Sequence, residues 1–273
     1  MIKQLLKKII KQKGYLLIKQ GVYLLVNPTS EERVKSLIEK LYPYQIKKDL
    51  IRIGPKGDGG YLIPDDLEGV KACFSPGVNQ ISEFEQDCNK LGMEVFMADK
   101  SVDKPNLNIP PDQYNFIKKH IGCTNNSVYI TMDEWVNSSW LNEDEDLILQ
   151  MDIEGGEYLS LINTSDSLMK RFRILVIEFH FLQDLWNPHF FEFAEVVFDK
   201  ILQTHSCVHI HPNNIEGISH QYGIGIPKVA EFTFLRNDRT KFENYKMQFP
   251  HELDYDNTNN ESIVLPQNWH KSI

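Results

Sequence analysis

Three apolar segments of this sequence end in pairs of polar residues whose chemistry suits proton transfer or cation binding. The pairs are Asp152 and Glu154, Glu178 and His180, and His209 and His211. Side chains two residues apart on a strand point to the same side, so the members of each pair would act together. Carboxylates and imidazoles gathered at neighbouring strand ends can orient a hydroxyl group, remove its proton or hold a hard divalent cation.

The same residues define a candidate metal site. The expected ligands are Asp152, His180, His209, His211 and Glu231. Asn213 and Asn214 would add oxygen ligands at the same end of the sheet. The set is rich in oxygen ligands and contains no cysteine, which favours magnesium or manganese over zinc.

Each of these features also has a structural interpretation. A single pair such as Glu178 and His180 is more often a satisfied polar pair than a functional one. Glu154 and Glu157 follow an apolar segment at the start of a predicted helix, where acidic side chains complement the helix dipole. The sequence leaves these alternatives open.

A glycine-containing turn and a later aspartate indicate a nucleoside-type cofactor. Ser75–Asn79 follows the apolar run Ala72–Phe74, and Gly77 would let a ligand approach the backbone and a helix N-terminus. The next apolar run ends at Asp99, 22 residues after Gly77, where an acid can accept hydrogen bonds from ribose hydroxyls. The chain has no G-x-G-x-x-G fingerprint, which counts against a dinucleotide.

The elements that would position these residues are short apolar segments, which alternate with helix-compatible ones from about residue 50. The predicted strands are Tyr61–Ile63, Ala72–Phe74, Val95–Ala98, Val128–Ile130, Leu147–Met151, Ile174–Phe179, Cys207–Ile210 and Val229–Leu235. The predicted helices between them are Glu83–Leu91, Tyr158–Arg171 and Phe190–Thr204. This alternation is typical of an α/β fold with a mostly parallel sheet covered on both faces. The segment His211–Lys228 contains no long helical pattern, which suits an antiparallel last strand.

The N-terminal segment differs from the rest in charge. Residues 1–20 hold six lysines and no acid, with apolar residues at helical spacing among them. This pattern predicts a basic amphipathic helix, which can lie on an anionic membrane surface or pack on a partner. A capping box at Thr29–Glu32 predicts a second helix over residues 30–41.

Composition limits the classes of protein to consider. The 273 residues include 41% hydrophobic and 25% charged residues with a net charge of −9, as in ordinary globular domains. No stretch approaches the ~18–20 apolar residues of a membrane span. A chain with an acidic net charge is also poorly suited to bind nucleic acid, whose phosphates require a basic surface. Four scattered cysteines fit a reducing cytoplasm.

The expected domain organisation follows from these patterns. Residues 1–48 are expected to form a helical appendage, and residues 49–273 a single domain. The polar segment from about Arg236 to the C-terminus is expected to be a surface extension. The expected location is the cytoplasm, with a peripheral contact to the inner face of the membrane through residues 1–20.

The segment Leu147–Glu157 resembles the D-[IV]-E-G-x-E signature of FkbM-type S-adenosylmethionine-dependent methyltransferases. The likeness extends over residues 50–236. Further similar segments are Asp58–Pro64, Ser75–Asn79 with the cofactor loop, Ile177–His180 with the following strand, and His209–Asn214 and Glu231–Arg236 with the closing strands. Pro76 stands where the family more often has glycine or phenylalanine. The resemblance implies a class I methyltransferase fold, a Rossmann-like doubly wound sheet with N-terminal helices added here.

The resemblance also implies which residues bind the cofactor. They are Ser75, Gly77 and Asn79 at its amino-acid portion, Asp99 at the ribose, Thr131 and Asp133 over the adenine, and Asp152 beside the methyl group. Methyl transfer is an in-line displacement, so the enzyme positions the acceptor oxygen and removes its proton. Asp152 and His180 are the expected catalytic residues, as a base or as metal ligands.

The expected function is that of an S-adenosylmethionine-dependent O-methyltransferase. Family members suggest as acceptor a sugar hydroxyl of a bacterial surface glycan, such as capsule or lipopolysaccharide, or of its nucleotide-linked precursor. One alternative is a dinucleotide-dependent nucleotide-sugar enzyme. Another is a non-catalytic member of the fold that binds glycans or acts as a scaffold.

Overall fold

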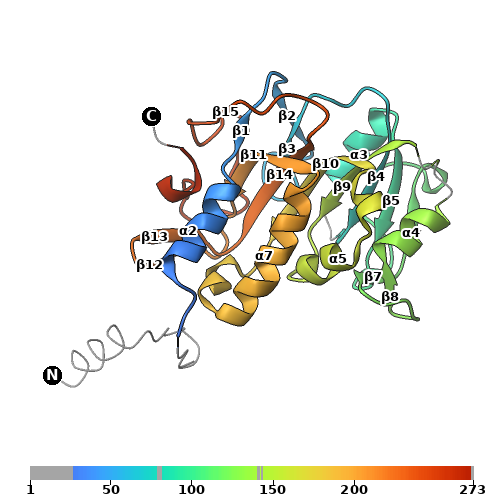
Figure 1. Cartoon of the computed structure of the whole chain (residues 1–273). Coiled ribbons are helices and arrows are strands. Elements are labelled where there is room, and N and C mark those ends of the chain that lie inside the picture. The colour runs from blue at the N-terminus through green and yellow to red at the C-terminus, as the bar shows by residue number, and fades with distance from the viewer. Residues whose placement is uncertain (1–26, 79–81, 140–141, 143, 272–273) are drawn as a thin grey trace.

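A seven-stranded sheet forms the centre of the protein in a computed structural model that describes residues 27–78, 82–139, 142 and 144–271 (Figure 1). In spatial order the strands are β11 (His205–Pro212), β14 (Ala230–Arg236), β10 (Phe172–Phe179), β9 (Asp146–Met151), β4 (Val70–Pro76), β5 (Glu94–Ala98) and β6 (Asn115–Ile117). Only β14 among them runs antiparallel to its neighbours. The predicted α/β class, with a mostly parallel sheet and an antiparallel last strand, is confirmed.

Helices connect the strands and cover the sheet. They are α2 (Glu31–Lys40), α3 (Glu83–Lys90), α4 (Met132–Ser138), α5 (Glu157–Asn163), α6 (Asp166–Met169) and α7 (Pro188–Leu202), with short 3-10 helices η1 (Pro111–Gln113), η2 (Leu182–Trp186) and η3 (Gln267–Trp269). The predicted helix over residues 30–41 is confirmed, with Ser30 as its N-cap. The single helix predicted over Tyr158–Arg171 is wrong, because Ser165 caps a new helix by accepting the Leu168 N–H.

Four small two-stranded sheets lie beside the main one. They pair β1 (Tyr44–Gln45) with β15 (Asn244–Tyr245), β2 (Leu50–Ile53) with β3 (Tyr61–Pro64), β7 (His120–Gly122) with β8 (Tyr129–Thr131), and β12 (Ile218–Gln221) with β13 (Ile224–Pro227). Two predicted strands, Tyr61–Ile63 and Val128–Ile130, therefore pair outside the main sheet. Apolar runs of this length do not specify their pairing partner.

The sheet is covered on both faces. Figure 1 shows α2, α4, α5 and α7 on one face, where Phe74, Trp135 and Trp186 belong to a large apolar core. The hairpin β2–β3 and helix α3 supply Tyr61 and Phe84 to a second core on the other face. These two faces leave the carboxyl ends of the parallel strands free to carry polar residues.

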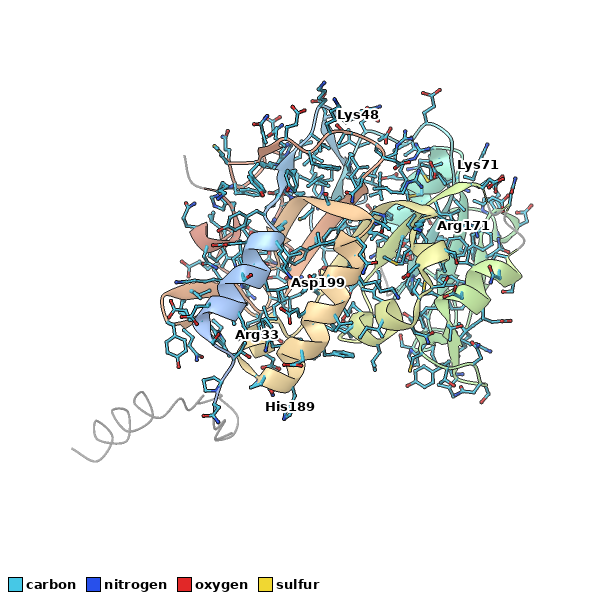
Figure 2. The ribbon with its side chains drawn as sticks, in the orientation of Figure 1. Arg33, Lys48, Lys71, Arg171, His189 and Asp199 are labelled. Carbon is cyan, nitrogen blue, oxygen red and sulfur yellow. The ribbon has the colours of Figure 1, made fainter. Side chains whose placement is uncertain are left out.

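Ion pairs at the surface connect helix α2 with helix α7. Arg33 lies 3.1 Å from Glu192 and 2.7 Å from Glu195, and Lys40 lies 2.8 Å from Asp199 (Figure 2). Beneath these pairs the apolar face of α2 is buried in the larger core. The helix thus packs on the main body of the protein.

The C-terminal segment is not the surface extension that its polar composition suggests. Leu265 and Trp269 are buried in the larger core, and the Trp269 indole N–H donates to the Gly225 carbonyl at 2.9 Å. These two apolar residues near the C-terminus anchor an otherwise polar segment, and two residues are too few to set up a periodic pattern in the sequence. The prediction for this segment is wrong.

Within these described ranges, no helix has the length and apolar character required to cross a membrane. The basic helix predicted over residues 1–20 lies outside the described residues, as does Asn79.

Candidate functional site

A row of ionisable side chains crosses the carboxyl ends of the parallel strands, and we call it the ionisable row. Its members are Asp152, Glu178, Glu231 and His211. In the register, Glu178 pairs with Glu231 on β14, and Glu231 pairs with His211 on β11. Asp152 follows the last residue of β9, beside Glu178. The prediction that these strand ends meet at one edge is confirmed.

The C-terminal segment covers the β14 and β11 end of this row. His209 Nε2 lies 2.9 Å from Asp254 Oδ1, and His211 Nδ1 lies 3.7 Å from the same oxygen. Asn257 donates to Glu231 Oε1 at 2.6 Å. His209 and Glu231 are therefore hydrogen-bonded by residues that no local pattern associated with them, and His211 lies near one of these residues.

The predicted five-residue metal set is consequently not assembled as one group. Among the described residues, the histidine, cysteine and carboxylate side chains that could share an ion are Asp152, Glu178 and His180, whose candidate ligand atoms lie within 4.8 Å of one another. His209 and His211 do not belong to this group and lie next to Asp254 instead. Glu178, which is not one of the five predicted ligands, belongs to this group, and Glu231 does not.

His180 is oriented by a buried carboxylate. Its Nδ1 lies 3.2 Å from Glu157 Oε1, and Glu157 also accepts the backbone N–H groups of Ile153 at 3.0 Å and Gly155 at 3.1 Å. Glu157 therefore favours the tautomer with the proton on Nδ1, which leaves Nε2 free to face Asp152 and the neighbouring acids. The interpretation of Glu157 as an acid at a helix start is confirmed, and its contact with His180 was not predicted.

Three carboxylates surround the Nε2 atom of the imidazole ring. His180 Nε2 lies 3.4 Å from Glu154, 3.5 Å from Glu178 and 3.9 Å from Asp152. Burial raises the pKa of Asp152 to about 7 and that of Glu178 well above its ordinary value. Burial lowers the pKa of His180, but the hydrogen bond and charge of Glu157 outweigh this effect and leave it raised. Burial thus disfavours the charged form of both carboxylates, whereas their negative neighbours favour the charged form of His180.

Close backbone packing holds the strand ends together. Gly77 has φ +91°, and a Cβ atom on it would lie 1.5 Å from the Asp152 carbonyl oxygen. The Gly77 N–H donates to the Ala98 carbonyl at 3.0 Å, and the Asp152 N–H donates to the Pro76 carbonyl at 3.3 Å. Glycine is thus required where the turns after β4 and β9 touch. Glu154 also has positive φ, 56°, a strained conformation of the kind found at functional sites.

A cavity of about 890 Å³ opens at this edge of the sheet. Asp152, Glu178, His180, Gly77 and Asp99 all line it. Seven of its lining residues are aspartates or glutamates, and within the described part of the chain neither lysine nor arginine lines it. The cavity therefore favours cationic or neutral ligands over anionic ones.

Only some of the predicted cofactor residues line the cavity. Asp99 is 8% exposed in the cavity wall, where its Oδ1 accepts the Ser101 N–H at 2.6 Å. Ser75 is fully buried and does not line the cavity, because its hydroxyl is bound to Glu85 and to Gln150 Oε1.

Two residues expected over the adenine make other contacts instead. Thr131 accepts the Glu134 N–H at 3.3 Å as the N-cap of α4, and Asp133 accepts the Ser165 N–H at 2.9 Å. Neither lines the cavity, whereas the nearby His120 does. The structure therefore does not place Thr131 and Asp133 with the other site residues, because the Thr131 side chain caps α4 and the Asp133 side chain binds Ser165 at the start of α6.

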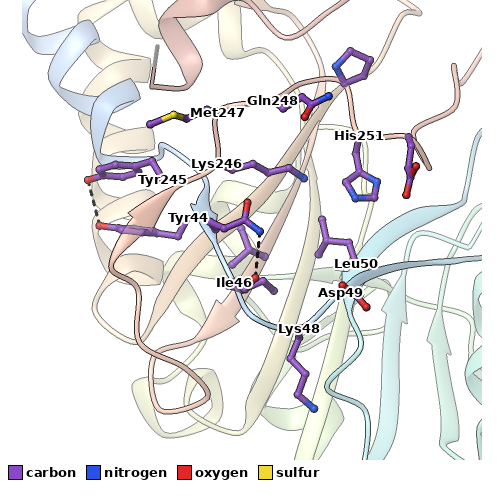
Figure 3. A pocket seen from close by; sticks show the side chains of 14 residues that line it. Tyr44, Ile46, Lys48, Asp49, Leu50, Tyr245, Lys246, Met247, Gln248 and His251 are labelled. Atoms are coloured by element: carbon purple, nitrogen blue, oxygen red, sulfur yellow. Dashed lines mark hydrogen bonds between the residues drawn. The ribbon is translucent and has the colours of Figure 1, made fainter. Parts of the chain in front are cut away.

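A second cavity of about 560 Å³ lies between β1, β15 and the segment that follows β15 (Figure 3). Lys246 faces it, and its Nζ lies 3.4 Å from His209 Nδ1. Burial lowers the pKa of His209 to about 4, so a neutral His209 donates to Asp254 and accepts from Lys246. These groups satisfy one another, whereas Asp152 Oδ1 in the larger cavity is buried without a hydrogen-bond partner in the described structure. We take the larger cavity as the functional site.

Comparison of the sequence with protein-family models and with curated proteins finds no match.

Proposed function

We propose that the protein is an S-adenosylmethionine-dependent O-methyltransferase that acts on a sugar hydroxyl. The observation that carries the proposal is the acidic cavity of about 890 Å³ at the carboxyl ends of β4, β5, β9 and β10. The sulfonium of S-adenosylmethionine is a cation, which is favoured by a lining that is rich in acids and, among the described residues, free of lysine and arginine. The pyrophosphate of a dinucleotide would be repelled by the same lining, which argues against the alternative nucleotide-sugar enzyme.

The topology supports a cofactor site at this position. The chain order reverses at β4, which has β5 on one side and β9 on the other. Open α/β sheets bind ligands in the crevice outside the carboxyl ends of such strands. Asp99 at the end of β5 would accept hydrogen bonds from the ribose hydroxyls, and the backbone at Gly77 would approach the amino-acid portion. The antiparallel last strand also agrees with the class I methyltransferase fold that the FkbM resemblance implies.

The proposed reaction needs a group that deals with the acceptor proton. S-adenosylmethionine supplies an electrophilic methyl group bonded to a positive sulfur. The acceptor oxygen bonds to that methyl carbon as the carbon–sulfur bond breaks, and the hydroxyl proton must leave the oxygen. His180 Nε2, with Glu157 behind Nδ1, is placed to receive it, and Asp152 and Glu178 would stabilise the resulting imidazolium. The other role, cation binding by the same residues, would acidify the hydroxyl instead.

The cavity favours an uncharged acceptor. Tyr129 is 40% exposed and Ile215 57% exposed in its lining, and both offer apolar surface to a sugar ring. The lack of lysine and arginine among its described lining residues disfavours a nucleotide-linked sugar, which carries phosphates. A sugar residue already built into a capsule or lipopolysaccharide fits better. The glycan class itself comes from the family resemblance.

Calorimetric titration of the full chain tests the proposal. S-adenosylhomocysteine should bind one-to-one, and NAD and a nucleotide sugar should give no saturable heat. Binding of NAD with none of S-adenosylhomocysteine would overturn the proposal. Binding of S-adenosylhomocysteine without methyl transfer from labelled S-adenosylmethionine to any capsule or lipopolysaccharide fraction would favour the non-catalytic alternative.

A further inference from the structure

We infer that Asp152, Glu178 and His180 together bind one divalent cation of the magnesium and manganese class. Their candidate ligand atoms lie within 4.8 Å of one another. An ion that holds its ligands at about 2.1 Å keeps them within roughly 4.2 Å of each other. A pair at the 4.8 Å limit would therefore need to close by at least about 0.6 Å. Two carboxylates and one imidazole suit a hard cation better than a thiophilic one.

Two further residues hold the ligands in position, as the outer shell of a metal site does. Glu157 accepts from His180 Nδ1, so that Nε2 is the nitrogen free to bind an ion. Asn213 donates to both oxygens of Glu178 at 3.3 Å. Glu157 is itself fixed by the two backbone N–H groups before α5, which leaves the imidazole ring little freedom to turn.

The carboxylates of the cluster are only partly satisfied by their protein neighbours. Asp152 Oδ1 is buried without a hydrogen-bond partner, and the Glu178 carboxylate is buried beside it. In the part of the chain that the structure describes, no lysine or arginine lines the cavity to neutralise them. The Asp152 side chain as a whole is 27% exposed, so the cluster opens toward the cavity on this side. A bound cation would keep open positions there for an acceptor hydroxyl.

A bound cation would also determine whether His180 acts as a metal ligand or as the base that receives the acceptor proton. With Nε2 on the ion, His180 is a ligand and the acceptor proton goes elsewhere. Glu154, whose side chain is 84% exposed in the same cavity, is the neighbouring carboxylate that would take it. This role in methyl transfer rests on the proposed function, whereas binding of the cation does not.

Titration of the EDTA-treated, dialysed full chain with Mn²⁺ tests the site. The electron paramagnetic resonance signal of free Mn²⁺ should show one saturable site, and Mg²⁺ should compete for it. Glu178→Gln should weaken Mn²⁺ binding by at least tenfold. Glu216→Gln, which removes the same charge from another part of the cavity lining, should change it by less than threefold. Asp152→Asn provides a second ligand variant, and circular dichroism melting shows whether each variant folds.

Absence of saturable binding, or equal weakening by Glu178→Gln and Glu216→Gln, would overturn the inference, since the acidic lining would then attract cations without a defined site. The cofactor is titrated separately. Binding of S-adenosylhomocysteine by a protein that fails to bind Mn²⁺ would overturn the cation site and leave the proposed function standing. The reverse result would keep the site and reject the function.

Discussion

Glu178 of β10 and Glu231 of β14 lie directly opposite each other on antiparallel strands. Like charges in this position repel. Burial raises the pKa of Glu231 to about 7, and burial with the charges of Asp152 and Glu231 raises that of Glu178. Asn257 donates to Glu231, whereas Asn213 donates to Glu178. The pair marks the boundary between the covered end of the ionisable row and the end that faces the cavity.

Substitution of Asp99 should weaken cofactor binding. Asp99→Asn removes a charge-assisted acceptor from the cavity wall, at a cost of roughly 1.5–3 kcal/mol, or about 10- to 150-fold in the Kd of S-adenosylhomocysteine by calorimetry. Asp133→Asn is the matched control, because Asp133 holds Ser165 at the start of α6 outside the cavity. It should lower the melting temperature and leave the Kd unchanged. Equal losses of affinity would mean that α4 does form part of the cofactor site.

Gly77 should be far less tolerant of a side chain than a glycine of similar conformation elsewhere. Gly92 has φ +86°, and a Cβ atom added to it would have no other atom within 4 Å. Gly92→Ala should therefore lower the free energy of unfolding by about 1–2 kcal/mol, the cost of the left-handed conformation alone. Gly77→Ala adds a collision with the Asp152 carbonyl and should cost clearly more. Urea denaturation compares the two variants. Similar losses would show that the turns after β4 and β9 can separate.

His205 should make the protein less stable as pH falls. Burial lowers its pKa to about 4, and its Nε2 lies 2.8 Å from the Phe172 carbonyl oxygen. Between about pH 6.5 and 4 the unfolded chain binds a proton at this residue that the folded chain does not, so acidification favours unfolding. The contribution should be on the order of 2–3 kcal/mol from pH 7 to 4. Urea denaturation across this range should show a shallower pH dependence for His205→Gln, and an identical slope in both proteins would contradict the prediction.

Removal of residues 1–20 should abolish binding to anionic membranes. The six lysines of this segment would be attracted to acidic lipid headgroups. Flotation with vesicles containing phosphatidylserine should recover the full chain and not the shortened one, while neither should float with purely neutral vesicles. The Kd of S-adenosylhomocysteine should be the same for both. Equal flotation of both chains would assign the segment to a protein partner.

Local sequence patterns suffice to predict which strand ends carry the acids and histidines. Leu147–Met151 and Ile174–Phe179 are apolar runs that end directly before Asp152 and His180, so the polar residues must emerge at the edge of the sheet. The mostly parallel topology follows from the alternation of such runs with helical segments. Asp152 and His180 could therefore be placed together before their contact was known.

Contacts between distant residues could not be predicted in the same way. Asp254 binds His209 across 45 residues, and Asn257 binds Glu231 across 26. A polar segment has no apolar periodicity to show that it packs on a sheet, so nothing near Asp254 distinguishes it from a solvated acid. The same limit applies to Asp133, which accepts the Ser165 N–H across 32 residues.

The position of β14 has a consequence for the order in which the protein assembles. It is the last strand of the main sheet along the chain, yet it lies in the interior, between β10 and β11. In the described structure it is the only neighbour of β11 in that sheet. During synthesis, β11 therefore has no place in the sheet until residue 236 has emerged from the ribosome, and β10 is meanwhile an exposed edge open to wrong pairings. The half of the sheet that carries Glu178 and His180 is completed last.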